Sequence, residues 1–265
     1  MDLGGVKLFL DVIPKFEKGR ILKKEMLENL RDYPRNFYDI YFKDHSEGII
    51  SGADVYICEK SAIIKKGIVK HKGRIYMLED ELEIPYYQTN KEALIKIKFD
   101  DKKDEPDYYR FDSQIIIDYN TRIEEDELEL GRFKLREGAV LRSEYTDFYD
   151  FLTEFNTINI INVEYAGRKK STMSPVITNY FANIVFKNNT DNMLDMFFAM
   201  QCANNNTVER DIIQYYISNR LGIEYKDYSN LQIYQYLAMI VKEIESGIKK
   251  KMDITLNRPS RIIVD

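Results

Sequence analysis

The chain has 265 residues, and its 39 Lys and Arg against 44 Asp and Glu give a formal net charge of −5. Its 44% apolar and 31% charged residues are typical of a folded globular protein and exclude a collagen-like or disordered chain. The longest apolar runs, such as residues 115–117, are far shorter than the roughly 20 residues that a transmembrane helix needs. Membrane insertion is therefore not expected.

The N-terminus and the cysteines indicate the compartment. No apolar segment of about 7–15 residues follows the N-terminal lysines, which argues against a secretory signal. Cys58 and Cys202 both lie in apolar stretches, and we expect two buried, reduced thiols. These features predict a cytoplasmic protein.

The first predicted element is a helix over residues 17–31. Its apolar residues recur with helical spacing, and Pro34 follows just beyond the expected end. The pattern is amphipathic, and we expect the apolar side to lie against a sheet. The apolar positions are Ile21, Leu22, Met26, Leu27 and Leu30.

Strand patterns dominate the next hundred residues and recur about every ten residues between short polar turns. Such spacing predicts an antiparallel sandwich or barrel. In residues 95–99 apolar residues alternate with lysines, which predicts one apolar and one charged face. Gly131 interrupts the phase of the last strand and predicts a bulge. The predicted strands cover residues 49–57, 62–70, 74–78, 82–87, 95–99, 108–119 and 128–135.

Helical patterns take over near residue 165. Ser174 followed by Pro175 marks a helix start, and Gly222 marks a helix end. Ser229 with Gln232, and Asn206 with Glu209, have the spacing of capping boxes, and Asp191 is a further candidate cap. The last helix carries apolar residues from Leu231 to Ile248, and its last turn carries Lys249-Lys250-Lys251.

Segregated strands and helices predict an α+β fold. We expect an N-terminal antiparallel β-sandwich domain over residues 1–164 and a C-terminal helical bundle domain over residues 165–265. In the bundle, a stripe of Met193, Met196 and Met200 favours a core face over an adaptable partner groove.

Residue sets that carry out catalysis are missing from the sequence patterns. The two histidines, His45 and His71, lie in polar turns, where we expect them exposed and without metal-ligand spacing. Acidic runs at residues 79–81 and 124–127 are typical of solvated turns, although paired carboxylates across a cleft would suit a carbohydrate-active enzyme. We therefore expect no enzyme, no catalytic or metal site, no cofactor and no small-molecule substrate.

A nucleic-acid-binding module is the alternative function. It requires a contiguous basic β-surface and an affinity that falls steeply with salt. The acidic balance of the chain argues against nucleic acid as a partner. The residues that would form this surface are Lys65, Lys66, Lys70, Lys72 and Arg74.

Taken in order, several glycine-punctuated segments resemble the TssK family. Residues 18–27 resemble its opening segment, and Gly48-Ile49-Ile50-Ser51-Gly52, residues 63–69 and residues 72–76 are similar to the β-sandwich shoulder that TssK shares with siphophage receptor-binding proteins. Residues 128–135, 141–148 and 157–161 resemble the stretch that leaves the shoulder, and the later helices would correspond to the neck.

This resemblance implies a non-enzymatic structural adaptor or hub in a phage-tail-like baseplate, as in type VI secretion or another contractile injection system. It implies a homotrimer whose shoulder docks onto baseplate wedge proteins. TssK proteins carry a further C-terminal head, whereas this chain ends at Asp265, so the resemblance is not extended to a membrane-complex or receptor contact.

Two groups of residues are expected to make these contacts. Partner docking is assigned to the opening segment, and self-association to the last helix, whose apolar residues spread around its circumference as in an intersubunit or an ordinary central helix. The docking residues are Gly19, Ile21, Leu22 and Met26, and the self-association residues are Tyr234, Leu237, Val241 and Ile244.

Overall fold

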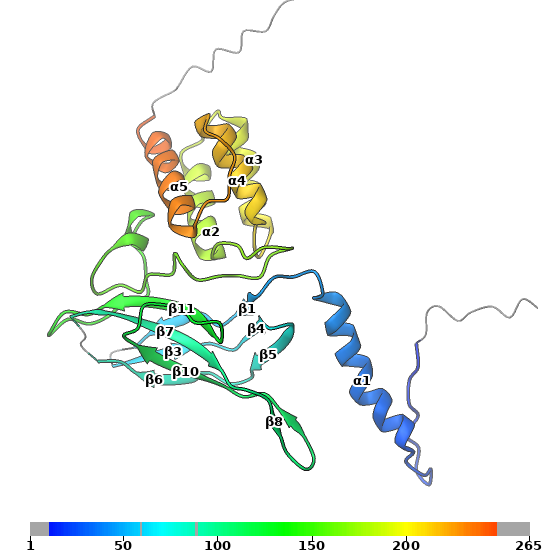
Figure 1. Cartoon of the computed structure of the whole chain (residues 1–265). Coiled ribbons are helices and arrows are strands. Elements are labelled where there is room, and N and C mark those ends of the chain that lie inside the picture. The colour runs from blue at the N-terminus through cyan, green and yellow to red at the C-terminus, as the bar shows by residue number, and fades with distance from the viewer. Residues whose placement is uncertain (1–10, 59, 88–89, 248–265) are drawn as a thin grey trace, which may run out of the picture.

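The computed structural model describes residues 11–58, 60–87 and 90–247, and Figure 1 shows its arrangement. Small antiparallel sheets form one layer, the C-terminal helices form a bundle above it, and helix α1 (Lys24–Tyr41) projects to one side. The predicted mixture of strands followed by helices is confirmed. Within the described residues, the strands form several small sheets.

Each sheet is antiparallel. One contains β1 (Gly48–Gly52), β4 (Gly67–His71) and β5 (Arg74–Leu78) in that order, and another contains β2 (Val55–Ile57), β3 (Ser61–Ile64) and β6 (Leu82–Pro85). A third places β7 (Glu92–Phe99) between β10 (Ser113–Asp118) and β11 (Glu127–Lys134). A short ribbon pairs β8 (Lys103–Asp104) with β9 (Tyr109–Arg110).

Two of the predicted strands are each divided in the structure. Residues 49–57 break because Gly52 and Ala53 adopt left-handed backbone conformations, with φ of 63° and 58°. Residues 62–70 break just before Gly67, where an added Cβ would collide with the backbone and side chain of Ala53. The close approach of these two bends therefore turns two predicted strands into four.

Strand β7 departs from its predicted pattern. The bulge at Gly131 is confirmed, since the β11–β7 register shifts between Glu129 and Gly131. The predicted charged face carries Lys96 and Lys98, but Lys96 is fully buried. Its Nζ lies 3.1 Å from Asp118 Oδ2 and 3.0 Å from Glu127 Oε2, and it donates to Arg122 O at 2.9 Å. Glu127, expected in a solvated run, is the nearly buried partner of this lysine.

Four C-terminal helices and a short 3-10 turn pack together. They are η1 (Tyr149–Leu152), α2 (Pro175–Lys187), α3 (Met193–Asn204), α4 (Arg210–Leu221) and α5 (Asn230–Glu245). The Ser174 cap with Pro175, the capping box of Ser229 and Gln232, and the left-handed Gly222 are confirmed. The predicted end of the last helix, from Ile248 through Lys251, lies outside the described residues.

Other local predictions for the bundle are wrong. Asn192, not Asp191, caps α3 through its side chain. Asn206 and Glu209 form no capping box, because α4 begins at Arg210 and Glu209 is itself the N-cap residue; its carboxylate accepts a hydrogen bond from Arg168 N at 2.8 Å. Cys58 is exposed, although Cys202 is buried as expected.

The methionine stripe also differs from its prediction. Met193 and Met200 are exposed, whereas Met196 is partly buried. The buried face of α3 carries Asp195, Phe198, Ala199 and Cys202 instead. Helical spacing alone was compatible with either side of α3 facing the core.

The buried apolar residues form two clusters. One is formed by residues of the sheet region, including Ile49, Ile64 and Phe133, and the other fills the helical bundle. Phe148 and Phe151 belong to the helical cluster, although they precede the predicted domain boundary at residue 165. The division into domains 1–164 and 165–265 stays a prediction.

Asp150 holds residues 142–153 together through hydrogen bonds, and its replacement should destabilise the protein. Its carboxylate accepts hydrogen bonds from Arg142 (2.6 Å), Thr146 N (2.9 Å) and Thr153 Oγ1 (2.6 Å), and these bonds, that of Arg142 foremost, hold its pKa well below the usual range. Asp150→Asn should lower the free energy of unfolding at pH 7 by about 2 kcal/mol.

The sign of the pH dependence follows from the lowered pKa of Asp150. A carboxyl group with a lower pKa in the folded state stabilises the protein at neutral pH, and this contribution is lost as the pH falls below about 4. Urea denaturation should therefore show the wild-type and Asp150→Asn stabilities converging in acid. Glu144→Gln, at an exposed position, is the control and should have little effect at any pH.

Candidate functional site

Helix α1 exposes a continuous apolar face. Leu27, Leu30, Pro34, Phe37 and Tyr41 recur at alternating spacings of three and four, which places them along one side of the helix. None of the residues of α1 is buried. In globular proteins an amphipathic helix ordinarily covers its apolar side against other elements, so this face is a candidate docking surface.

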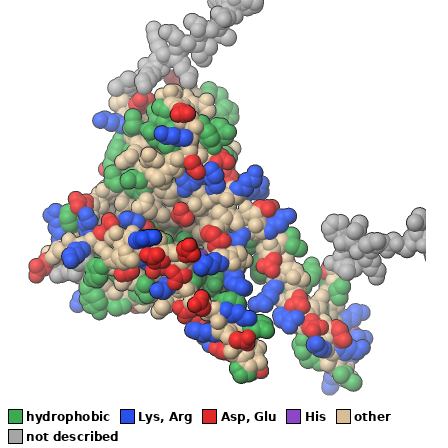
Figure 2. Space-filling model, in the orientation of Figure 1, with side chains coloured by type: hydrophobic (Ala, Val, Ile, Leu, Met, Phe, Trp, Pro, Cys, Tyr) green, Lys and Arg blue, Asp and Glu red, His purple; other side chains and the backbone are tan. Residues whose placement is uncertain are grey.

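Aromatic rings dominate the C-terminal half of this face. The exposed fractions of Tyr33, Phe37, Tyr38 and Tyr41 lie between 44% and 62%. The rings of Phe37 and Tyr41 stack at 5.8 Å, and Tyr38 packs edge-on against Phe37 at 5.9 Å. Figure 2 shows α1 set apart from the sheets, with green apolar side chains among acidic and basic ones. The rings are thus arranged before any partner binds.

The base of α1 is anchored by a buried lysine. Lys70 of β4 donates from Nζ to Phe42 O at 2.7 Å and to His45 O at 2.6 Å. Phe42 O also accepts a hydrogen bond from His45 N at 3.1 Å, and a cation at this position complements the negative end of the helix dipole. Ser46 N also donates to Gly167 O at 2.8 Å. The projecting helix is therefore held at the end nearest the sheets.

The predicted docking residues lie at the start of this element. Gly19 has a φ of 86°, in a turn closed by Arg20 N donating to Glu17 O at 3.1 Å, and this left-handed conformation favours glycine. Ile21 is 84% exposed and Leu22 is about half exposed, whereas Met26 in the first helical turn is partly buried.

The predicted bounds and position of this helix are wrong. It begins at Lys24 instead of residue 17, continues through Pro34 to Tyr41, and does not bury its face against a sheet. Because Pro34 was expected to end the helix, the aromatic half of the face was not predicted. The signal was present in the sequence, because the alternating spacing continues unbroken from Leu27 to Tyr41.

The predicted self-association residues face the core of their own chain. Tyr234, Leu237 and Val241 are buried in the helical cluster, and Ile244 packs against it partly buried. The ring of Tyr234 stacks on Phe148 at 5.3 Å, and its hydroxyl donates to Phe148 O at 2.7 Å. These side chains therefore offer little surface to a second copy in the structure described.

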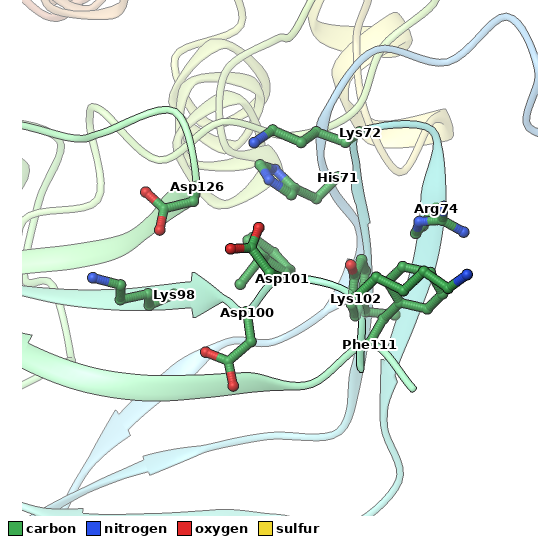
Figure 3. Close-up of a pocket in the computed structure, with 11 residues that line it drawn as sticks. His71, Lys72, Arg74, Lys98, Asp100, Asp101, Lys102, Phe111 and Asp126 are labelled. Carbon is green, nitrogen blue, oxygen red and sulfur yellow. The ribbon is translucent and has the colours of Figure 1, made fainter. Parts of the chain in front are cut away.

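A cavity of about 410 Å³ lies where the β4–β5 hairpin meets the end of β7 (Figure 3). The ring of His71 stacks on Phe99 at 4.0 Å, and the Arg74 guanidinium lies 3.7 Å from the centre of the Phe111 ring. Figure 3 shows the cationic ends of Arg74 and Lys102 pointing away from the carboxylates beside His71. The carboxylates that line the cavity are Asp100, Asp101 and Asp126.

The prediction that His71 is exposed is wrong, because it is buried at the end of β4. Burial lowers its pKa more than the nearby Glu47 carboxylate raises it, so the neutral imidazole is favoured. Its Nε2 has no hydrogen-bond partner within the described structure. Among the described residues, no group of three or more His, Cys, Asp or Glu side chains is arranged to hold a metal ion.

The basic surface that nucleic-acid binding would need is not assembled. Lys70 is buried beneath the end of α1, as described above. Lys65 pairs with Glu81 at 2.8 Å and Lys66 pairs with Asp80 at 3.4 Å, so acidic side chains accompany both. Of the predicted face, Lys70 is thus buried and Lys65 and Lys66 lie beside carboxylates, whereas Lys72 and Arg74 are exposed.

Comparisons with known proteins give a distant match. No protein-family model and no curated protein matches the sequence. A crystal structure of TssK aligns with 90% of this chain and 72% of its own, at 7% identity and a TM-score of 0.44. The chain thus bears a distant structural resemblance to TssK. A TssK-TssF-TssG baseplate subcomplex of the type VI secretion system aligns with 87% of this chain and 98% of its own, at 6% identity and a TM-score of 0.37.

None of the helices within the described ranges is both long enough and apolar enough to cross a membrane.

Proposed function

We propose that this protein is a non-enzymatic structural adaptor of a phage-tail-like baseplate, and that α1 is the element that docks onto another baseplate protein. The observation that carries the proposal is the exposed aromatic face of α1 on a helix whose base is anchored. Recognition of this kind lays an amphipathic helix into an apolar groove of the partner.

The energetic case rests on the four aromatic side chains. At about half exposure each, and roughly 200 Å² for a full side chain, together they offer about 400 Å² of surface to a partner. At about 25 cal/mol/Å², burying that area contributes about 10 kcal/mol before the costs of association are subtracted. The aromatic half of α1 is thus large enough to act as the centre of an interface.

The finer features of the proposal come from the ordered segments that resemble TssK. We infer that the small sheets act as a sandwich-like shoulder, that the helices act as a neck, and that the protein works as a cytoplasmic homotrimer. Its docking partners would be baseplate wedge proteins.

Affinity purification of the tagged full chain from its native cells, followed by mass spectrometry, tests this function. We expect wedge proteins to co-purify, and a Phe37→Glu, Tyr41→Glu variant to recover at least about tenfold less of them, because charges replace two interface anchors. Tyr215→Glu on α4 is the matched control, since Tyr215 is also about half exposed.

Two results would contradict the proposal. One is purification that yields tagged protein without any wedge protein. The other is equal recovery of wedge proteins by the α1 variant and by Tyr215→Glu. Far-UV circular dichroism of both variants should match the wild type, because neither position is buried.

A further inference from the structure

A second cavity, of about 410 Å³, is lined by residues of both the sheets and the helical bundle. Strands β1, β2 and β11 contribute one part of the lining, and α2 and the segment before η1 contribute another. Ligand-binding cavities commonly have this size and lie where two packed units meet. The side chains that line the cavity therefore indicate which class of ligand fits it.

The cavity combines a buried interior with an accessible rim. Ile49, Tyr165 and Ser174 are between 1% and 6% exposed, whereas Tyr56 is 52% exposed and Glu144 is also exposed. Most of the remaining lining side chains are aliphatic or aromatic. A ligand can therefore enter past the rim and place an apolar group inside.

The charges that line the cavity are both negative. Asp54 and Glu144 supply carboxylates, and no Lys, Arg or His of the described ranges is among the lining residues. The partly buried Asp54 accepts a long hydrogen bond from Tyr165 Oη at 3.5 Å. Lys65, whose backbone N–H donates to Asp54 O at 2.9 Å, pairs its ammonium group with Glu81 instead. Burial consequently raises the pKa of the Asp54 carboxyl more than its hydrogen bonds lower it.

The backbone beside Asp54 is held in an unusual conformation. Gly52 and Ala53 have φ of 63° and 58°, and Ala53 is itself buried and lines the cavity. The left-handed region is unfavourable for a residue with a Cβ, and strain of this kind clusters at ligand-binding sites. The close approach of Gly67 holds the bend, so Asp54 is presented to the cavity by a fixed backbone.

Two tyrosines of the lining are also fixed in position. Tyr145 donates from its hydroxyl to Ile158 O at 2.8 Å, and Tyr180 donates to Tyr145 O at 2.9 Å. The two rings meet edge-to-face at 6.2 Å. Aromatic rings attract cations, and rings that are already ordered lose little freedom when a ligand binds.

We propose that this cavity binds a small organic cation, in which an amidinium, guanidinium or ammonium group is attached to an apolar body. The cationic group would lie against the Asp54 carboxylate and the tyrosines, and the apolar body against side chains such as Ile49, Val163 and Val176. An anion would be repelled by both carboxylates, and a neutral ligand would leave Asp54 without a counter-charge.

The same cationic chemistry has two sources, a free amine or an arginine or lysine side chain of another protein. The cavity contains no residue of α1, so the assignment does not depend on the proposed docking role of that helix.

Isothermal titration calorimetry of the full chain with benzamidine, an amidinium on an aromatic ring, tests the site. We expect benzamidine to bind at least about tenfold more tightly than benzamide, its neutral analogue, or benzoate, its anionic one. Asp54→Asn should weaken benzamidine binding at least about tenfold. Asp107→Asn is the matched control, because it removes the same charge from the exposed turn between β8 and β9, and it should leave binding unchanged.

A second variant tests the cavity without changing its charge. Val176→Phe should fill part of the space and also weaken benzamidine binding, while circular dichroism reports whether each variant folds. To distinguish the two sources, protein purified from its native cells is denatured and its released small molecules are identified by mass spectrometry. Release of an amine supports a free ligand, whereas a co-purified protein that benzamidine displaces supports a side chain.

The titrations with the three probes decide the proposal even where a variant does not fold. Absence of benzamidine binding to the wild type overturns the site, as does equal binding of benzamidine and benzamide. Benzamidine binding that persists unchanged in folded Asp54→Asn and Val176→Phe proteins also overturns it.

Discussion

Replacing Lys96 with methionine is expected to lower the free energy of unfolding at pH 7 by about 3–5 kcal/mol. The side chain is fully buried in the central strand β7 and its ammonium group lies about 3 Å from two carboxylates. Methionine fills much of the same volume but leaves the nearly buried Glu127 carboxylate without its cation. The loss therefore comes from an uncompensated buried charge.

The pH dependence of this effect has a definite sign. Burial tends to lower the pKa of Lys96, but the hydrogen bonds to Glu127 and Asp118 outweigh it and raise the pKa. A lysine whose pKa is raised in the folded state stabilises the protein fully below the unfolded pKa of about 10.4 and loses that contribution as the pH rises through the folded value. The difference between wild type and Lys96→Met should therefore shrink in strongly alkaline buffer.

Urea denaturation followed by circular dichroism measures both effects. Lys98→Met, two residues along the same strand, is the control, because Lys98 is only partly buried. Adding Glu127→Gln to Lys96→Met should recover part of the lost stability by removing the buried charge. Equal losses for the Lys96 and Lys98 variants would show that the buried ion cluster does not stabilise the fold.

Replacing Phe148 with alanine is expected to cost about 3–5 kcal/mol of stability. Its ring is fully buried in the helical cluster, stacked on Tyr234 at 5.3 Å and edge-on to Phe181 at 6.3 Å. Alanine would remove these contacts and leave a cavity among α2, α5 and η1. Thermal unfolding of the full chain measures the loss.

The adjacent residue supplies the control. Tyr149 is exposed, and its hydroxyl donates to Glu245 Oε2 at 3.1 Å, so Tyr149→Ala should cost about 1 kcal/mol or less. A fragment of residues 165–265 lacks Phe148, Phe151 and Ile161 of the helical cluster, and we expect it to unfold at lower temperature than the bundle in the full chain. Unchanged stability in Phe148→Ala would contradict the placement of this segment in the core.

Local sequence signals predicted the parts of the fold that depend on a few neighbouring residues. Ser174 with Pro175, and Ser229 with Gln232, begin helices because each motif satisfies backbone groups within one turn. Gly222 ends a helix and Gly131 marks a bulge because the backbone at those points needs a conformation or spacing that is set locally. Strand β5 also has the predicted bounds.

The same local patterns predicted only some of the residues that could contact a partner. Ile21 and Leu22 were predicted to lie within the helix, whereas they precede α1 and are both exposed, and their part in docking stays a prediction. Tyr33, Phe37 and Tyr41 were missed because a proline within a helical pattern ordinarily ends it, whereas α1 continues through Pro34. Tyr234 and Leu237 were assigned to a second copy, but their own chain covers them.

By itself, the sequence determined the order of strands and helices and most of the helix caps, because these depend on spacings of a few residues. Tertiary structure alone decided that Lys96 and Lys70 are buried, that α1 projects with its apolar face uncovered, and that Phe197 faces solvent while Phe198 faces the core. The physical reason is that burial depends on partners distant in sequence: Lys96 needs Glu127 and Asp118, and Lys70 needs the carbonyls after α1. Periodicity shows that a helix has two faces, but only its packed neighbours determine which one is covered.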